Sequence, residues 1–225
     1  MALLGRGFLA IWNDIAEGGE AEVNHWYTGE HAPERLGVPG FLRGRRFVAI
    51  DGHPKYFTLY ETENAKVLAS QPYVARLNDP TPWTQKALAL FRNTNRTACA
   101  VTRSLGQGTG GVVATLRLAP APGRDTALRD WLGGTALPAV VAEPGVVAAA
   151  LGEADLSSTR VPTTERTLRD REDEVAAWVV VVDGIDVESV ETALTRHLSP
   201  TALARAGAAP EVTRGLYRLQ YALVR

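Results

Sequence analysis

The fold is decided by a stretch of sequence that occurs twice. Residues 25–40 read HWYTGEHAPERLGVPG, and residues 130–145 read DWLGGTALPAVVAEPG. Three landmarks recur at one constant offset of 105 positions: Trp26 with Trp131, Pro33 with Pro138, and Pro39-Gly40 with Pro144-Gly145. Tryptophan and proline are uncommon residues, so the shared offset indicates that one structural unit is repeated within the chain.

The segments around the landmarks follow the same order in both halves. We predict first-half strands at 8–15, 41–50, 56–61 and 97–104, with helical segments at 19–32, 64–70 and 83–90. We predict second-half strands at 112–118, 146–151, 176–182 and 216–224, with helices at 125–137 and 187–197. The first helix is expected to stop near Pro33, because proline cannot continue an α-helix without loss. This order is close to the βαββαβ order of a ferredoxin-like unit.

A ferredoxin-like unit covers one face of its sheet with helices and leaves the other face bare. Residues 176–182, AAWVVVV, are apolar on both faces, as expected of a strand that is buried on both sides. We therefore predict an α+β fold in which two tandem ferredoxin-like βαββαβ repeats pack sheet-to-sheet as an intramolecular α/β barrel. The predicted repeats are 1–105 and 112–225, joined by a glycine-rich linker at 106–111, and the second carries a charged insertion at about 152–174.

Composition restricts the partners that we expect. The chain has 225 residues with 24 Lys+Arg against 25 Asp+Glu, a balance that argues against nucleic acid as a partner. No apolar run approaches the roughly 20 residues that span a bilayer, and the first residues lack a signal-peptide pattern, so we expect a cytoplasmic protein without a membrane partner. The four histidines and the single cysteine form no metal-ligand motif, and we predict no metal and no cofactor.

Residues 25–41 resemble one known family. An aromatic residue, Tyr27, stands four residues before His31-Ala32-Pro33, which is similar to the EthD-like branch of the dimeric α/β-barrel superfamily, with Tyr where Trp is usual. The resemblance extends over essentially the whole chain as a fused form of that barrel. The superfamily includes monooxygenases, cyclases, lactone isomerases and haem-dependent enzymes, so the resemblance implies the fold without selecting a reaction.

The repeat also indicates where a site should lie. At the 105-residue offset the polar residues His25, Glu30, His31 and Arg35 correspond to Asp130, Thr135, Ala136 and Val140. Packing requires the framework in both halves, whereas chemistry is needed once, so we expect the site in the first half. The candidate catalytic residues are His31, Tyr27 and Glu30, because histidine is the usual proton-transfer group near neutral pH.

Aromatic and polar residues of the strands and helices complete the expected site. Alternation along the strands suggests that Leu9-Ile11 and Phe57-Leu59 face the helices, which would direct Trp12, Asp14, Tyr56 and Tyr60 into the barrel. The candidate substrate-binding residues are Trp12, Asp14, Trp26, Arg35, Tyr56, Tyr60 and Trp83.

We consider three functions. The first is a cofactor-independent enzyme that acts by acid/base chemistry on a small, largely apolar organic molecule in a barrel pocket, by isomerisation, cyclisation, elimination or oxygenation. The second is a non-catalytic small-molecule-binding or structural barrel, in which His31 would cap a helix end. The third is a haem-dependent enzyme with a single histidine ligand. A buried His31 that faces an enclosed cavity would favour an enzyme. An exposed His31 beside a filled barrel would favour the non-catalytic barrel. The sequence does not decide whether the protein forms a homodimer.

Overall fold

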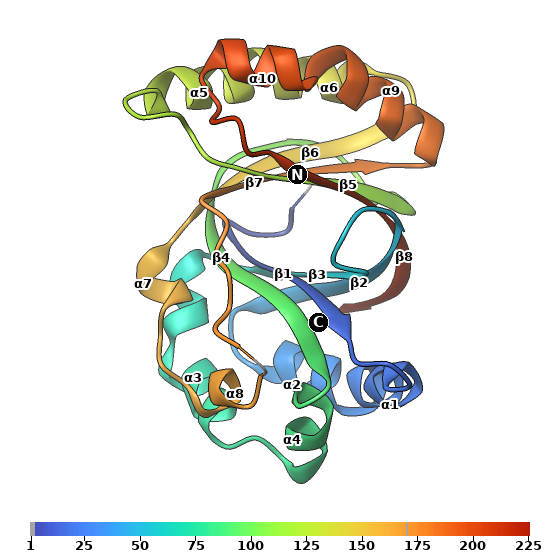
Figure 1. Cartoon of the computed structure of the whole chain (residues 1–225), viewed down its shortest axis with the longest axis vertical. Helices are drawn as coiled ribbons and strands as arrows, with labels where there is room; N and C mark the ends of the chain where they lie inside the picture. Colours follow the sequence, from blue (N-terminus) through green and yellow to red (C-terminus); the bar gives the residue numbers. More distant parts are fainter. Residues whose placement is uncertain (1–2, 170) are drawn as a thin grey trace.

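Eight strands form one closed barrel in the computed structural model, which describes residues 3–169 and 171–225 (Figure 1). The first-half strands are β1 (Gly7–Ile15), β2 (Phe41–Asp51), β3 (Tyr56–Thr62) and β4 (Phe91–Gly106). The second-half strands are β5 (Val112–Leu118), β6 (Val146–Ala154), β7 (Trp178–Gly184) and β8 (Thr213–Val224).

The strands are ordered β1-β3-β2-β8-β5-β7-β6-β4 around the barrel. Each half contributes its fourth, first, third and second strand in that spatial sequence, which is the ferredoxin-like arrangement. Antiparallel pairing of β2 with β8 and of β4 with β6 joins the two halves. The predicted fold class is confirmed, and the barrel closes within one chain.

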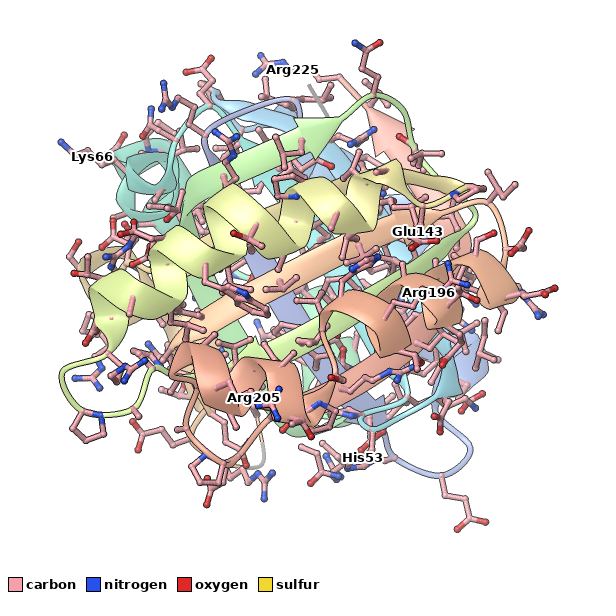
Figure 2. The ribbon with its side chains drawn as sticks, turned by 90° about the horizontal axis from the view of Figure 1, so that it is seen from above. His53, Lys66, Glu143, Arg196, Arg205 and Arg225 are labelled. Atoms are coloured by element: carbon pink, nitrogen blue, oxygen red, sulfur yellow. The ribbon has the colours of Figure 1, made fainter. Side chains whose placement is uncertain are left out.

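Helices cover opposite sides of the barrel (Figure 1). The first half carries α1 (Glu20–Trp26), a π-helical turn η1 (Tyr27–His31), α2 (Ala32–Gly37), a 3₁₀ turn η2 (Ala65–Ala69), α3 (Gln71–Asn78) and α4 (Pro82–Leu88). The second half carries α5 (Asp125–Trp131), a π-helical turn η3 (Leu132–Ala136), α6 (Leu137–Ala142), α7 (Leu156–Thr159), α8 (Thr164–Thr167), α9 (Val187–His197) and α10 (Pro200–Ala206). From above, α5, α6, α9 and α10 lie across the second-half strands (Figure 2).

The first helix of each half continues through its proline, so the predicted stop near Pro33 is wrong. In each half a five-residue π-helical turn directly precedes the helical segment that contains the proline near its start, α2 with Pro33 and α6 with Pro138. A π turn shifts the backbone hydrogen bonds by one residue, and proline is tolerated at the start of a helical segment, where its missing N–H costs least. The two π turns stand at the same 105-residue offset as the sequence landmarks.

The helices α3 and α10 were not predicted, nor were the short α7 and α8 in the insertion, and β4 begins at Phe91 rather than at residue 97. Both α3 and α10 have a proline at their first or second position, which masks the apolar periodicity of a short segment. The side chain of Ser199 accepts a hydrogen bond from the backbone N–H of Ala202 at the start of α10, as an N-cap does.

The interior of the barrel is a packed core. Every strand contributes to one apolar cluster that includes Phe8, Trp12, Phe57, Val113 and Val181. The rings of Trp12 and Phe57 stack with centroids 4.9 Å apart. For β1 the prediction is correct, because Leu9 faces the helices and Trp12 faces the interior. For β3 the predicted faces are reversed, because Phe57 and Leu59 face the interior.

Directly opposed residues in an antiparallel pair point to the same side of the sheet. Because Trp12 of β1 pairs with Phe57 of β3, Phe57 must enter the interior with it. Leu9 pairs with Tyr60, and both belong to the cluster beneath the first-half helices. Tyr56 and Tyr60 therefore lie on the helix-covered side, not in the interior where they were expected.

Charged groups also cross the barrel interior between the two halves. The guanidinium of Arg45 on β2 lies 2.5 Å from the carboxylate of Asp183 on β7 and 3.4 Å from that of Glu61 on β3. All three side chains are buried. A buried charge requires partners of opposite charge. The contacts of Arg45 with Glu61 and Asp183 therefore link the first half to the second across the barrel interior.

The insertion leaves the second half after β6 and lies over the first half (Figure 1). The Thr159 hydroxyl accepts a 3.0 Å hydrogen bond from the backbone N–H of Ala98, and the Asn78 side chain accepts one of 3.0 Å from the N–H of Thr164. Segments about 60 to 90 residues apart in sequence thus meet beside α3 and β4. None of the helices in the part of the chain described above has the length and apolar character needed to cross a membrane.

Candidate functional site

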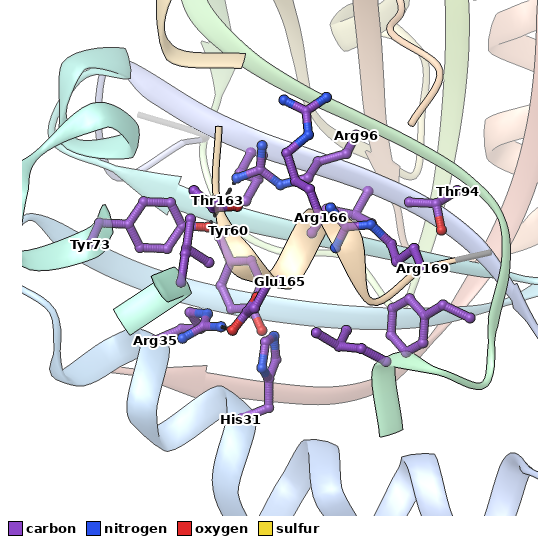
Figure 3. A pocket seen from close by; sticks show the side chains of 15 residues that line it. His31, Arg35, Tyr60, Tyr73, Thr94, Arg96, Thr163, Glu165, Arg166 and Arg169 are labelled. Carbon is purple, nitrogen blue, oxygen red and sulfur yellow. Dashed lines mark hydrogen bonds and ion pairs between the residues drawn. The ribbon is translucent and has the colours of Figure 1, made fainter. Parts of the chain in front are cut away.

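A small cavity lies between the outer face of the first-half sheet and its helices. It offers about 40 Å³ to the centres of water molecules, which is room for a few of them. Strand residues Leu9, Ile11 and Tyr60 form its floor, α-helical and loop residues form its sides, and the insertion forms its roof (Figure 3). The cavity is therefore outside the filled barrel, and most of its lining comes from the first half.

The π turn positions His31 over this cavity. Trp26 ends α1, and Tyr27 and His31 are the first and last residues of the π turn. The rings of Trp26 and His31 approach to 4.2 Å between centroids. The indole Nε1 of Trp26 donates a 3.1 Å hydrogen bond to the Thr84 hydroxyl on α4, which fixes this stack. The Tyr60 ring lies 6.2 Å from the His31 ring on the sheet side.

His31 is buried among aromatic rings, and one of its ring nitrogens has no hydrogen-bond partner in the described part of the chain. Its side chain is only 9% exposed, and its Nδ1 atom has no hydrogen-bond partner among the described residues. Burial, together with the positive charges of Arg35, Arg46 and Arg169, holds the pKa of His31 well below its ordinary value. The imidazole is therefore neutral at cellular pH, and it is a weaker base than a histidine in water.

Two phenols complete the inner wall. The hydroxyls of Tyr27 and Tyr60 are buried and interact with each other, but neither makes a hydrogen bond of standard geometry to a described side chain or backbone group. Burial raises the pKa of both phenols, most strongly that of Tyr60. Unpartnered buried polar groups are rare in folded proteins, so their clustering with His31 marks a place where a ligand can satisfy them.

Arg46 lies behind Tyr27. Its guanidinium is 4.6 Å from the Tyr27 ring centroid and 4.3 Å from that of Tyr56, and it donates hydrogen bonds to the side-chain oxygens of Asn24 and Gln220. Burial lowers the pKa of Arg46, whereas the nearby phenols favour its charged form. This cation fixes both tyrosine rings and contributes to the neutrality of His31.

The roof is attached by an ion pair. Arg35 on α2 binds the carboxylate of Glu165 on α8, and both side chains are buried. Figure 3 shows these two side chains and His31 pointing toward one another. Arg35 also lies 5.8 Å from the ring centroid of Tyr73, whose hydroxyl accepts a 3.1 Å hydrogen bond from Arg96. The pair holds the pKa of Arg35 above its usual range.

The structure brings five predicted site residues together around the cavity and His31. His31, Arg35 and Tyr60 line the cavity, and Tyr27 and Trp26 contact His31. Tyr56 is buried nearby against Arg46. Glu30 does not face His31, because its carboxylate accepts hydrogen bonds from the hydroxyls of Thr81 (2.6 Å) and Thr84 (3.0 Å).

Three further predicted residues lie outside the cavity. Trp83 donates a 2.9 Å hydrogen bond to Glu22 and packs on α1. Asp14 accepts hydrogen bonds from the backbone of Lys55 and from Asn93 at the barrel's end. Trp12 is in the barrel interior, where its Nε1 donates to the Thr115 hydroxyl at 3.2 Å.

Several lining residues were missed by the sequence-based prediction. They are Tyr73, Thr94, Arg96, Thr163, Glu165, Arg166 and Arg169. The charge-rich composition of residues 152–174 was the available signal for the last four, but nothing in the sequence indicated that this segment crosses to the other half.

A haem held by one histidine does not fit the cavity while the roof is closed. The free space beside His31 holds only a few water molecules, and the buried Arg35–Glu165 pair occupies the adjoining volume. The described residues also contain no group of three or more histidine, cysteine, aspartate or glutamate side chains suited to a metal ion.

The strand topology defines a class: the chain has the fold of the ferredoxin-like α/β-barrel proteins, with both units in one polypeptide. A candidate monooxygenase from Fusobacterium nucleatum is similar over 99% of this chain and 96% of its own, with a TM-score of 0.62 and 11% identity. An anthrone oxidase-like protein matches over 100% and 95%, with a TM-score of 0.56 and 14% identity.

A candidate chlorite dismutase is similar over 96% of this chain and 95% of its own, with a TM-score of 0.59 and 12% identity. Identities this low show a shared fold and leave the reaction open. No protein-family model and no curated protein sequence matches the chain.

Proposed function

We propose that the protein is an enzyme that moves a proton on a small, largely apolar organic molecule in this cavity, with His31 as the base. One observation carries the proposal: His31 is buried at the cavity wall with an unpartnered Nδ1. A histidine that capped a helix would stand at the helix end and bond to backbone groups. The helix instead continues from His31 to Gly37.

The surroundings suit one chemical step. A neutral imidazole nitrogen takes a proton from an acidic C–H or O–H of the substrate, and the electron pair stays on the substrate as an enolate or phenolate. The cation of Arg35 and the hydroxyl of Tyr60 line the same cavity and stabilise that negative charge. The imidazolium returns the proton to another atom, which gives an isomer, or the anion reacts further. It expels a leaving group of the substrate, attacks an electrophilic atom of the substrate and closes a ring, or is oxygenated by dissolved O2 as the oxidant.

The second half supports this assignment by contrast. It repeats the π turn at η3, but Ala136 and Val140 occupy the positions that correspond to His31 and Arg35. Leu132 stands at the position of Tyr27. These apolar residues belong to the second-half core, so the corresponding helix of that half provides framework alone.

We also propose that the chain is related to the EthD-like branch, which residues 25–41 resemble. We propose further that both halves arose by duplication of one unit. The names of the solved neighbours, among them candidate monooxygenases and an anthrone oxidase-like protein, suggest flat ketones with an acidic C–H as probes. Anthrone itself is such a probe. It is larger than the free cavity, so its entry requires the roof to be displaced.

The experiment compares proton transfer in matched histidine variants. Exchange of the acidic C–H of anthrone for deuterium is followed by NMR without oxygen, and anthrone oxidation is followed by absorbance in air. We expect His31→Gln to slow both by about 10²–10⁴-fold, the usual contribution of a general base. The control is His25→Gln, an exposed histidine on α1 that does not line the cavity, and we expect it to retain the wild-type rates.

Both variants are melted in parallel to show that they are folded. A folded His31→Gln protein with wild-type rates would remove the base from the proposal. The non-catalytic binding barrel would then be the better description of the protein.

A further inference from the structure

The cavity carries more positive than negative charge. Four arginines line it, Arg35, Arg96, Arg166 and Arg169, against a single lining carboxylate, Glu165. Just outside the lining, Asp173 lies 2.7 Å from Arg169 and 3.7 Å from Arg166, and Glu34 lies 3.3 Å from Arg35. Three carboxylates therefore face four guanidinium groups.

Arg96 is the guanidinium left without a carboxylate. Its side chain donates a hydrogen bond to the Tyr73 hydroxyl, and no carboxylate in the described part of the chain pairs with it. Arg96 is only 8% exposed. Burying a charged group without a counter-charge is unfavourable. Binding of an anion beside the Arg96 guanidinium would therefore be favourable.

Glu165 occupies the place where that anion would bind. It comes from the insertion, 130 residues after Arg35 in sequence, and its carboxylate reaches the buried Arg35 at the cavity wall. A carboxylate on the roof thus fills a site whose other walls are supplied by the first half. Arg35 and Arg96 both contact Tyr73, one at its ring and one at its hydroxyl, so they border the same part of the cavity.

The rest of the lining fits an apolar, flat ligand body. Leu9, Ile11, Leu88 and Phe91 present apolar side chains. The Thr94 hydroxyl is buried there without a hydrogen bond of standard geometry to the described residues, as are the Tyr60 hydroxyl and His31 Nδ1. These groups supply hydrogen bonding at a few points on an otherwise apolar wall, which is typical of small-molecule sites.

We propose that the substrate is an aromatic carboxylate or a similarly flat apolar anion, which replaces Glu165 as the partner of Arg35 and is held also by Arg96. The inference rests on the proposed function, because it concerns the same cavity and names the class of its ligand. In the free protein the Glu165 carboxylate substitutes for the carboxylate of the substrate and closes the roof.

The test uses benzoate and its neutral counterpart benzamide as probes, with binding measured by NMR titration. We expect Glu165→Gln to bind benzoate about ten- to a hundredfold more tightly than the wild type, the range given by one charge-assisted hydrogen bond. Benzamide affinity should stay the same. The double variant Arg35→Gln/Glu165→Gln is the matched control, and it should lose the gain.

Arg96→Gln provides an independent result in a protein that keeps the Arg35–Glu165 pair. We expect it to weaken benzoate at least about tenfold and to leave benzamide unchanged. Equal benzoate affinities in the wild type and Arg96→Gln would overturn the proposal. So would a gain in Glu165→Gln that benzamide shares.

The two proposals fail separately. The benzoate titrations change Glu165, Arg35 and Arg96 and keep His31 intact, whereas the exchange assay changes His31 alone. If benzoate behaves as expected while His31→Gln keeps full exchange activity, the anion site stands and the enzymatic role of His31 falls. If His31 is required for exchange but benzoate affinity does not change in the Glu165 and Arg96 variants, the enzymatic role of His31 stands and the anion site is refuted.

Discussion

Acid should destabilise the folded protein through His31. Burial and three neighbouring arginines hold the pKa of His31 well below its ordinary value in the folded state, whereas the unfolded chain returns it to about 6.5. As the pH falls below about 6.5, His31 becomes protonated in the unfolded chain but stays neutral in the folded protein. The free energy of unfolding therefore decreases from pH 7.5 downward.

The size of the effect follows from the unfolded pKa. If His31 stays neutral in the folded protein down to pH 5.0, protonation of the unfolded chain lowers the free energy of unfolding by about 2 kcal/mol between pH 7.5 and pH 5.0. Any protonation of the folded protein above pH 5.0 reduces this value, so about 2 kcal/mol is the upper limit for this group.

Urea unfolding at several pH values between 5.0 and 7.5 measures the effect in the wild type and in His31→Gln. Most other titrating groups are common to both proteins and cancel in the difference between the two curves. We expect the wild type to lose up to about 2 kcal/mol more than the variant over this range. Parallel curves would show that His31 titrates alike in both states and would refute the account of its environment.

Three further predictions concern the barrel. Asp183→Asn should lower the free energy of unfolding by about 3 kcal/mol in urea titrations, because it leaves the buried Arg45 charge only partly compensated. Gly152→Ala should cost about 1–3 kcal/mol in the same assay, because the added methyl overlaps the Phe8 ring inside the barrel. Gly40→Ala should cost at least about 1 kcal/mol by thermal melting, since its φ is +91°; unchanged stability in any of the three would contradict its stated cause.

The sequence predicted the fold well because the fold depends on local and repeated signals. Trp26 and Trp131 end corresponding helical segments, and Gly40 and Gly145 both adopt positive φ after corresponding helices. Such landmarks keep their spacing because packing and turns constrain them. The stop near Pro33 was predicted wrongly, because a π turn before a proline leaves no distinctive mark in composition.

The site could be predicted in part only. His31 and Arg35 are in the helix that the repeat singled out, and the structure places both at the cavity. Tyr60 was assigned to the wrong side of its strand, since alternation gives two faces without saying which is inside. Glu165 and its partners depend on a contact across 130 residues, which no local pattern reveals.

We propose that the functional site lies between the first-half sheet and its helices, next to His31. Methyl NMR of the protein with a bound probe tests this most directly. Signals of Ile11 and Leu88, which line the cavity, should shift on addition of benzoate or anthrone, while that of Val181 in the barrel interior should stay unchanged. Shifts at Val181 without any at Ile11 and Leu88 would place the ligand inside the barrel and contradict the account.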